Sequence, residues 1–184
     1  AASVYELVYD AERPEIFFKA PAWRVVTDGD AIAIRADSPV NVPEPELALV
    51  VNAHGEIVAY TVCNDMSSRS IEGENPLYLP QAKIFNGCCA LGPGIRLMDS
   101  DALADLAVHL RIIRQGSAAF EGDTRTSKIR RSLSSLVDYL FKETAFPSGV
   151  FLMTGTGIVP PESFSLAPGD TVEITIGELT LENV

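Results

Sequence analysis

Two apolar runs joined by a turn sequence constrain the fold of this chain more than any other feature. Residues 47–51 and 57–62 are almost wholly apolar, as the strands of a protein core are. Between them lies Asn52-Ala53-His54-Gly55, which has the turn chemistry of a β-hairpin. The sequence therefore predicts a hairpin of two largely buried strands.

Carboxylates stand at the open end of this predicted hairpin. Glu44 and Glu46 are two positions apart, so in an extended chain both side chains leave on the same face. Asp65 follows the second run, and folding the hairpin back brings it near the base of the first strand. Three carboxylates with no cysteine or histidine among them suit a hard cation such as Mg2+, Mn2+ or Ca2+. We call these three residues the carboxylate triad and predict that they bind a metal ion.

Two structural interpretations compete with the metal site. Glu44 and Glu46 could face water at a solvated strand end, which needs no cation. Asn64 and Asp65 could instead cap a short helix that begins near Ser67, a common structural use of aspartate.

Length and charge limit the classes of function. A chain of 184 residues fits one domain, and we expect residues 1–184 to form a single catalytic domain. The formal net charge of −11, from 14 basic and 25 acidic residues, argues against nucleic acid or an anionic membrane as partner. No apolar stretch approaches transmembrane length, and no signal peptide is visible. Because the chain has no initiator Met, we expect a fragment or a processed product.

Cysteines and histidines are few. Cys63, Cys88 and Cys89 are odd in number and two of them are adjacent, so a reduced, cytoplasmic compartment is the simpler interpretation. The spacings typical of zinc sites are absent, and His54 and His109 are the only histidines. A Ser-His-Asp mechanism is correspondingly disfavoured.

The rest of the chain predicts a β-rich α+β fold with one main helix. The helix is expected over residues 126–143, where apolar residues recur at helical spacing and basic residues are expected on a solvated face. Alternation and apolar runs predict the further strands 31–34, 89–95, 107–114, 118–121, 150–154 and 171–176.

An ordered set of short motifs resembles the fumarylacetoacetate hydrolase superfamily over essentially the whole chain. The motifs are residues 43–47, 64–69, Lys83 within 80–83, 90–93, 154–156, 166–170 and 172–174. Within that superfamily, residues 13–20, 72–81 and 155–160 look most like the 2-keto-3-deoxy-arabinonate dehydratase branch. The resemblance implies the family's C-terminal catalytic domain, a mixed β-sheet roll that is usually dimeric. It also implies a smaller N-terminal domain, which we expect to be absent from this chain.

The resemblance also implies roles for individual residues. The carboxylate triad would bind Mg2+, with Mn2+ or Ca2+ as alternatives. Lys83 would be catalytic and would neutralise or hydrogen-bond the bound 2-oxo acid beside the metal. Thr156 would reach the substrate carboxylate, with Phe18 and Lys19 as further substrate contacts, and Glu15 is the candidate acid/base. Each has a plainer alternative: Lys83 as a surface lysine, Glu15 as a loop acid, Thr156 as a turn residue and Phe18 as core.

Two positions depart from the family pattern. Ser70 stands where the family usually has an aspartate after Arg69, and Asn86 replaces a frequent aspartate after Lys83. Neither position belongs to the carboxylate triad.

The function implied is a metal-dependent lyase that dehydrates a 2-keto-3-deoxy pentonate to a dioxo acid such as 2,5-dioxopentanoate. The metal would stabilise the enolate formed when the C3 proton leaves. Alternatives on the same scaffold are a C–C hydrolase of acylpyruvate or fumarylacetoacetate-type diketo acids and an oxaloacetate decarboxylase. A non-enzymatic alternative is an inactive fragment that binds 2-oxo acids. We expect a small-molecule 2-oxo acid as the partner, together with a homodimer or higher homo-oligomer.

Overall fold

The structure is a computed structural model that describes residue 8 and residues 11–184. Its strands are β1 (Val25–Val26), β2 (Asn41–Val42), β3 (Pro45–Val51), β4 (Ile57–Asp65), β5 (Ser67–Ser68), β6 (Cys89–Leu97), β7 (Ala107–Arg114), β8 (Ser117–Arg125), β9 (Val150–Met153), β10 (Thr171–Ile176) and β11 (Leu179–Asn183). Its helices are α2 (Arg69–Glu74), α3 (Leu79–Lys83) and α4 (Leu133–Leu140), with short 3₁₀ turns at Ala22–Arg24, Pro76–Tyr78, Ser100–Leu103 and Thr126–Lys128. Among the described residues, no helix is long and apolar enough to cross a membrane.

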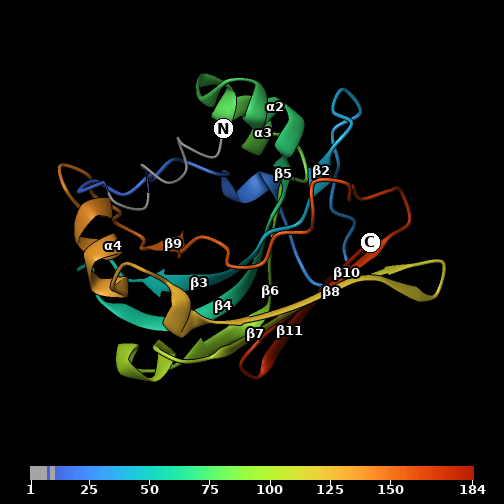
Figure 1. The fold of residues 1–184 in the computed structure, drawn as a ribbon. Coiled ribbons are helices and arrows are strands. Elements are labelled where there is room, and N and C mark those ends of the chain that lie inside the picture. The colour runs from blue at the N-terminus through green and yellow to red at the C-terminus, as the bar shows by residue number, and fades with distance from the viewer. Residues whose placement is uncertain (1–7, 9–10) are drawn as a thin grey trace.

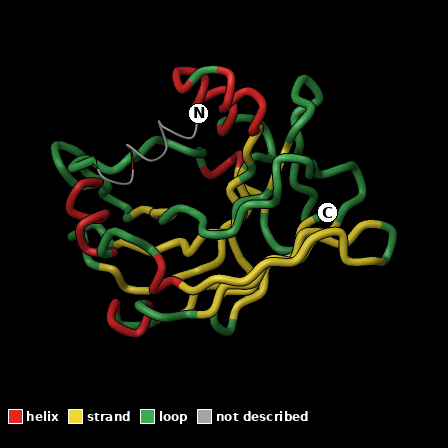
Figure 2. Tube along the Cα trace, in the orientation of Figure 1, coloured by secondary structure: helices red, strands yellow, loops and turns green. Residues whose placement is uncertain are grey.

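Two curved sheets form the body of the molecule (Figure 1). The first has the strand order β1-β6-β4-β3-β9 and the second the order β11-β10-β7-β8, while β2 and β5 pair separately. The first sheet is mixed, because β1 runs parallel to β6 and its other pairs are antiparallel. Figures 1 and 2 show α2 and α3 together at one end of the first sheet and α4 at the other.

The core lies between the sheets. Alternate residues of β3, including Leu47 and Leu49, point from one face of the first sheet toward β7 and β10 of the second sheet. The fully buried residues Leu110 and Ile174 meet them from the second sheet. The opposite face of β3 and β4 is therefore free of this core, and that face carries the polar residues described below.

The hairpin prediction is confirmed. β3 and β4 pair antiparallel from Pro45↔Asn64 to Val51↔Ile57. In the turn, the Asn52 side-chain oxygen accepts hydrogen bonds from the backbone N–H groups of His54 (2.9 Å) and Glu56 (3.0 Å). The strands predicted at 107–114 and 171–176 are present with the same bounds, and those at 89–95, 118–121 and 150–154 are present with altered ends. β1, β2, β5 and β11 were not predicted.

Two secondary-structure predictions are wrong. Residues 31–34 have no regular secondary structure and join no sheet, because the Ile32 N–H bonds to the Val184 carbonyl and the Ala33 N–H to the Gly87 carbonyl on a different segment. The helix predicted over 126–143 is shorter, since α4 begins only after Ser132, whose hydroxyl accepts a capping hydrogen bond from the Ser135 N–H at 3.1 Å. The basic residues that precede Ser132 therefore lie outside the helix.

Candidate metal and substrate site

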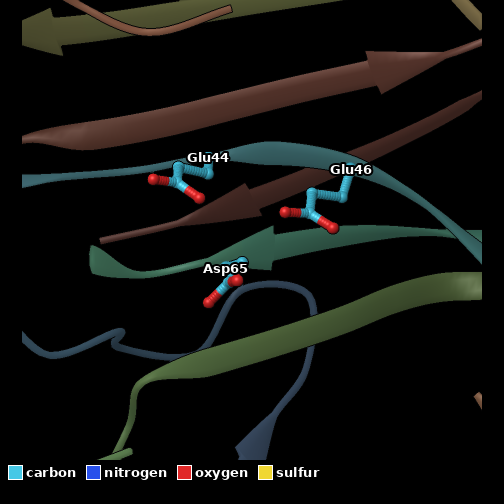
Figure 3. A group of neighbouring side chains, drawn as sticks. All are labelled: Glu44, Glu46 and Asp65. Atoms are coloured by element: carbon cyan, nitrogen blue, oxygen red, sulfur yellow. The ribbon is translucent and has the colours of Figure 1, made fainter. Parts of the chain in front are cut away.

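The backbone of the hairpin places two members of the carboxylate triad opposite each other. Glu44 lies directly before β3 and Asp65 ends β4; the Asp65 N–H donates to the Glu44 carbonyl at 2.9 Å and the Glu44 N–H to the Asp65 carbonyl at 3.2 Å. Glu46 is two residues further along β3, on the same side as Glu44, and Figure 3 shows the three carboxylates grouped on neighbouring strands. One carboxylate oxygen from each residue lies within 4.8 Å of the others.

Burial decides between the structural alternatives. Glu44, Glu46 and Asp65 are only 9%, 5% and 4% exposed, so the alternative of a solvated strand end is wrong. The helix-cap alternative is wrong as well, because α2 begins at Arg69 after Ser68, and Asp65 belongs to β4.

Burial also changes the protonation of these carboxyls. Desolvation, followed by repulsion from Asp65 and Glu44, raises the pKa of Glu46 to about 8. Desolvation likewise raises the pKa of Glu44, although the charge of Lys83 opposes the shift. A cation bound among these buried carboxyls would stabilise their ionised forms. Three oxygen donors without nitrogen or sulfur fit a hard divalent ion. The residues present therefore suit the metal that the sequence predicts.

Two buried lysines flank the carboxylate triad. The Lys83 ammonium, at the end of α3, donates to Glu44 Oε2 at 2.5 Å and reaches Asp65 Oδ2 at 3.4 Å. The Lys19 ammonium lies 2.5 Å from Asp65 Oδ1 in ion-pair contact and donates hydrogen bonds to the carbonyls of Met66 (2.9 Å) and Lys83. Lys83 is 5% exposed, so the alternative of a surface lysine is wrong. Burial alone would lower the pKa of Lys83, but the surrounding carboxylates, Glu44 foremost, outweigh it and raise that pKa.

The loop that follows β9 provides a backbone hydrogen bond to the Glu46 carboxylate. The Gly155 N–H donates to Glu46 Oε2 at 2.7 Å, and Gly155 has a φ of +87°, a conformation that glycine adopts without strain. Thr156 follows, and its hydroxyl donates to the Ile158 carbonyl at 3.1 Å. That contact is the turn chemistry weighed above, and the substrate contact of Thr156 stays a prediction.

Glu15 is exposed and lies near the same charges. Desolvation first, and repulsion from Glu72 second, raise the pKa of Glu15, while Lys83 lowers it. Glu72 lies on α2, where its Oε2 accepts a hydrogen bond from Ser67 at 3.0 Å. Glu72 was not among the predicted site residues, although it opens the motif at residues 72–81. The structure thus brings two acids to the edge of the lysine–carboxylate cluster.

The remaining predicted residues lie in varied surroundings. Phe18 is 70% exposed, so the alternative of Phe18 as core is wrong. Ser70, in place of the family's aspartate, has its hydroxyl 2.6 Å from that of Ser38, and Asn86 is exposed. His54 lies in the hairpin turn, at the far end of β3 and β4 from the carboxylate triad, and His109 faces Asp123 in the second sheet.

Comparison with known proteins identifies the family to which this curled mixed sheet and its acidic cluster belong. The chain matches the model of the fumarylacetoacetate (FAA) hydrolase C-terminal domain over residues 4–184 and belongs to that family. It is 48% identical over 180 residues to a 2-dehydro-3-deoxy-D-arabinonate dehydratase of Saccharolobus solfataricus, covering 96% of this chain and 60% of that protein. It is 49% identical over 182 residues to a probable 2-keto-3-deoxyxylonate dehydratase of Haloferax volcanii, covering 98% and 63%.

Solved structures agree with this assignment. A 2-keto-3-deoxy-D-arabinonate dehydratase complexed with magnesium and 2,5-dioxopentanoate matches with a TM-score of 0.92 at 48% identity, covering 98% of this chain and 65% of that one. A 5-carboxymethyl-2-hydroxymuconate delta-isomerase from Mycobacterium smegmatis matches with a TM-score of 0.75 at 28% identity, covering 94% and 69%. The chain thus spans less than two thirds of the length of the dehydratases that it matches. The fold predicted from the sequence is confirmed.

Proposed function

We propose that this chain is a magnesium-dependent hydro-lyase that removes water from a 2-keto-3-deoxy pentonate to give 2,5-dioxopentanoate. The observation that carries the proposal is the buried carboxylate triad between Lys83 and Lys19, in a chain 48% identical to a dehydratase solved with magnesium and that dioxo acid. The sequence motifs at residues 13–20, 72–81 and 155–160, which resemble the 2-keto-3-deoxy-arabinonate dehydratase branch, support the same reaction.

In this proposal Glu44, Glu46 and Asp65 hold the Mg2+ ion. When bound, the ion would supply positive charge for the C1 carboxylate and C2 oxygen of the substrate, which favours loss of a C3 proton. The Gly155 N–H fixes one oxygen of Glu46. Such a contact orients a metal ligand before the ion arrives.

The two lysines bind and orient the substrate. The Lys83 ammonium keeps its proton among the carboxylates, so it can donate a hydrogen bond to an oxygen of the 2-oxo acid. Lys19 adds a second positive charge on the Asp65 side. Phe18 is placed next to Lys19 in the chain, and we assign it to the wall of the substrate site, with Thr156 as the contact to the substrate carboxylate.

Glu15 is the acid/base. Its raised pKa suits a carboxyl that accepts a proton from C3 and later returns one. The C3 proton and the C4 hydroxyl leave together as water, which creates a C3–C4 double bond. A proton shift that moves this double bond toward C5 gives an enol, and its tautomer is the C5 aldehyde. No atoms beyond the water are lost.

The hydrolase alternative has less support in this structure. A hydrolase must activate water, and the family's common device for this is a histidine–glutamate pair. Both histidines lie away from the carboxylate triad, one in the hairpin turn and one in the second sheet. A dehydration that uses a glutamate alone is consistent with this arrangement.

We also propose a cytoplasmic homo-oligomer. Cys63, Cys88 and Cys89 are free thiols, as in proteins of a reducing compartment. Leu97 on β6 pairs with Ala59 on β4, Ala59 with Val50 on β3, and Val50 with Phe151 on β9. Leu97 and Phe151, the outer residues of this row across the sheet, are 77% and 44% exposed. Exposed apolar side chains of this kind suit a contact with a second copy of the chain, and light scattering of the purified chain measures the oligomeric state.

A substrate panel tests the function. The purified chain with Mg2+ is given 2-keto-3-deoxy-arabinonate, 2-keto-3-deoxy-xylonate, an acylpyruvate and oxaloacetate, and products are identified by mass spectrometry. We expect loss of water from one or both deoxy acids. C–C cleavage of the acylpyruvate, or loss of carbon dioxide from oxaloacetate, as the main reaction would contradict the proposal. Binding of pyruvate without turnover of any 2-oxo acid would favour the inactive fragment.

A further inference from the structure

Three sulfur atoms meet on the face of the first sheet that carries the carboxylate triad. The Cys63 Sγ lies 3.9 Å from the Cys89 Sγ and 2.8 Å from the Met153 Sδ. The Cys89 Sγ lies 4.0 Å from the same Met153 Sδ. Cys63 and Cys89 are buried, Met153 is half-buried, and none of the three has a part in the proposed dehydration.

The sheet register explains why these sulfurs meet. Cys63 on β4 pairs with Leu91 on β6, and Asp65 with Cys89, so the two cysteines are diagonal neighbours on one face. Met153, the last residue of β9, pairs with Ala48 of β3, which stands between β4 and β9. The small side chain of Ala48 leaves room above β3 for the Met153 thioether to reach the Cys63 thiol. The convergence is therefore built by the strands and does not depend on a loop.

We propose that Cys63, Cys89 and Met153 form a binding site for Cu(I). Two thiolates and a thioether are soft ligands, which select Cu(I) over hard cations. A metal ion equidistant from three sulfurs at about 2.3 Å needs sulfur–sulfur distances of roughly 4 Å. Two of the three distances, 3.9 and 4.0 Å, already have this value.

Only the Met153 sulfur must move for the third distance to open. Methionine is unbranched and adapts its conformation readily, and Met153 lies at the end of an edge strand where it is partly exposed. It therefore also provides the entry route for the ion. Burial first, and the neighbouring Cys89, Glu46 and Asp65 after it, raise the pKa of Cys63, so the thiol keeps its proton until the ion displaces it. One Cu(I) then replaces two protons, which leave to solvent. Zinc is less suited, because structural zinc sites want four ligands and this cluster supplies three sulfurs.

This sulfur site is distinct from the carboxylate triad, although Cys63 pairs directly with Glu46 across β3 and β4. The ligand sets share no atom and differ in softness, so each should hold its own cation. Cu(I) binding and dehydratase activity are separate properties, and failure of one leaves the other standing.

An anaerobic competition titration tests the site. The purified chain, saturated with Mg2+, competes with a chromophoric Cu(I) chelator, and the absorbance of the chelator complex reports the copper taken up. We expect one Cu(I) per chain. Cys63→Ser and Cys89→Ser should each weaken binding by at least about tenfold. Cys88→Ser is the matched control: Cys88 is equally buried and belongs to the same packing cluster, but among the described residues no hydrogen bond joins its sulfur to Cys63, Cys89 or Met153.

Met153→Leu keeps the test decisive if a serine variant does not fold. Leucine keeps the volume and removes only the sulfur, so it should weaken Cu(I) binding while circular dichroism and dehydratase activity stay unchanged. The proposal is overturned if the chain takes up no Cu(I). It is also overturned if Cys88→Ser weakens binding as much as Cys89→Ser does, or if excess Mg2+ displaces the copper.

Discussion

Glu44 and Asp65 exchange both of their backbone hydrogen bonds, at 3.2 and 2.9 Å, so the chain itself holds two acidic side chains opposite each other. Repulsion between the carboxylates cannot be relieved by separating them without breaking this end of the hairpin. The neighbouring ammonium groups of Lys83 and Lys19 stabilise the pair, and a divalent cation would do so further. The backbone pairing of β3 and β4 therefore creates a site that favours the binding of positive charge.

Gly155 gives the first test of how the site is oriented. Gly155→Ala should cost about 1 kcal/mol of folding stability, because a φ of +87° strains any residue with a Cβ. It should also weaken Mg2+ binding by about tenfold, because the N–H that fixes Glu46 is displaced. Calorimetric titration with Mg2+ and thermal unfolding measure the two effects.

Gly169→Ala is the matched control for that experiment. Gly169 has a φ of +86°, and, as at Gly155, an added Cβ would meet nothing within 4 Å. The stability loss should therefore be similar and the Mg2+ affinity unchanged. Equal loss of Mg2+ affinity in both variants would show that the Gly155 contact is not what orients Glu46.

Lys83→Met separates metal binding from turnover. Removing an ammonium beside the carboxylates removes repulsion toward a bound cation, so Mg2+ affinity should be unchanged or higher. Turnover should fall by at least about 100-fold, because a hydrogen-bond donor to the substrate is lost. Lys128→Met, at an exposed lysine, should leave both quantities unchanged. If Lys83→Met instead abolished Mg2+ binding, Lys83 would be a structural support of the carboxylate triad.

Glu72 should tune the pH dependence of the reaction through Glu15. Repulsion from Glu72 is the second cause, after burial, of the raised pKa of Glu15. Glu72→Gln removes that charge and should lower the pKa of Glu15, so the acidic limb of the kcat/KM profile moves to lower pH. Glu74→Gln, an exposed acid on the same helix, is the control and should leave the profile in place. An unmoved limb in Glu72→Gln would remove Glu15 as the base.

Asp170, which lies outside the proposed active site, should make the free energy of unfolding depend on pH. Hydrogen bonds from Arg114, at 2.8 and 2.6 Å, and from the Ala167 N–H lower the pKa of Asp170. A carboxyl with a lowered folded-state pKa stabilises the fold above its ordinary pKa, near 4, and this contribution is lost as the pH falls through the folded-state value.

Asp170→Asn should therefore cost about 1–2 kcal/mol at neutral pH, and the difference from wild type should shrink below about pH 4. Urea unfolding at several pH values measures this difference. A stability gap that stays constant down to pH 2 would contradict the role assigned to the Asp170 carboxylate.

Local patterns predicted the hairpin and its acids well. The spacing of Glu44 and Glu46 determines that both leave one face, and the turn at Asn52 determines that β4 returns toward them. Alternation in β7 and β10 likewise needs only neighbouring residues. These features were recoverable because their causes lie within a few positions of each other.

Features that depend on distant contacts were not recoverable from the residues alone. Lys19 lies in a segment without regular structure, and only the folded chain brings its ammonium to Asp65. The Gly155 N–H reaches Glu46 from a loop far along the sequence. The helix over 126–143 was predicted too long because Thr126 is drawn into the core, where its hydroxyl donates to the Leu103 carbonyl at 2.7 Å.

The most direct test follows product formation from 2-keto-3-deoxy-arabinonate while Mg2+ is returned to EDTA-treated protein. We predict no 2,5-dioxopentanoate without the metal and a saturable recovery of the wild-type rate with it. Glu46→Gln should recover little at the same Mg2+ concentration, because one of the three carboxylates is gone. Full activity of the metal-free chain would contradict the central claim that a cation held by Glu44, Glu46 and Asp65 drives the reaction.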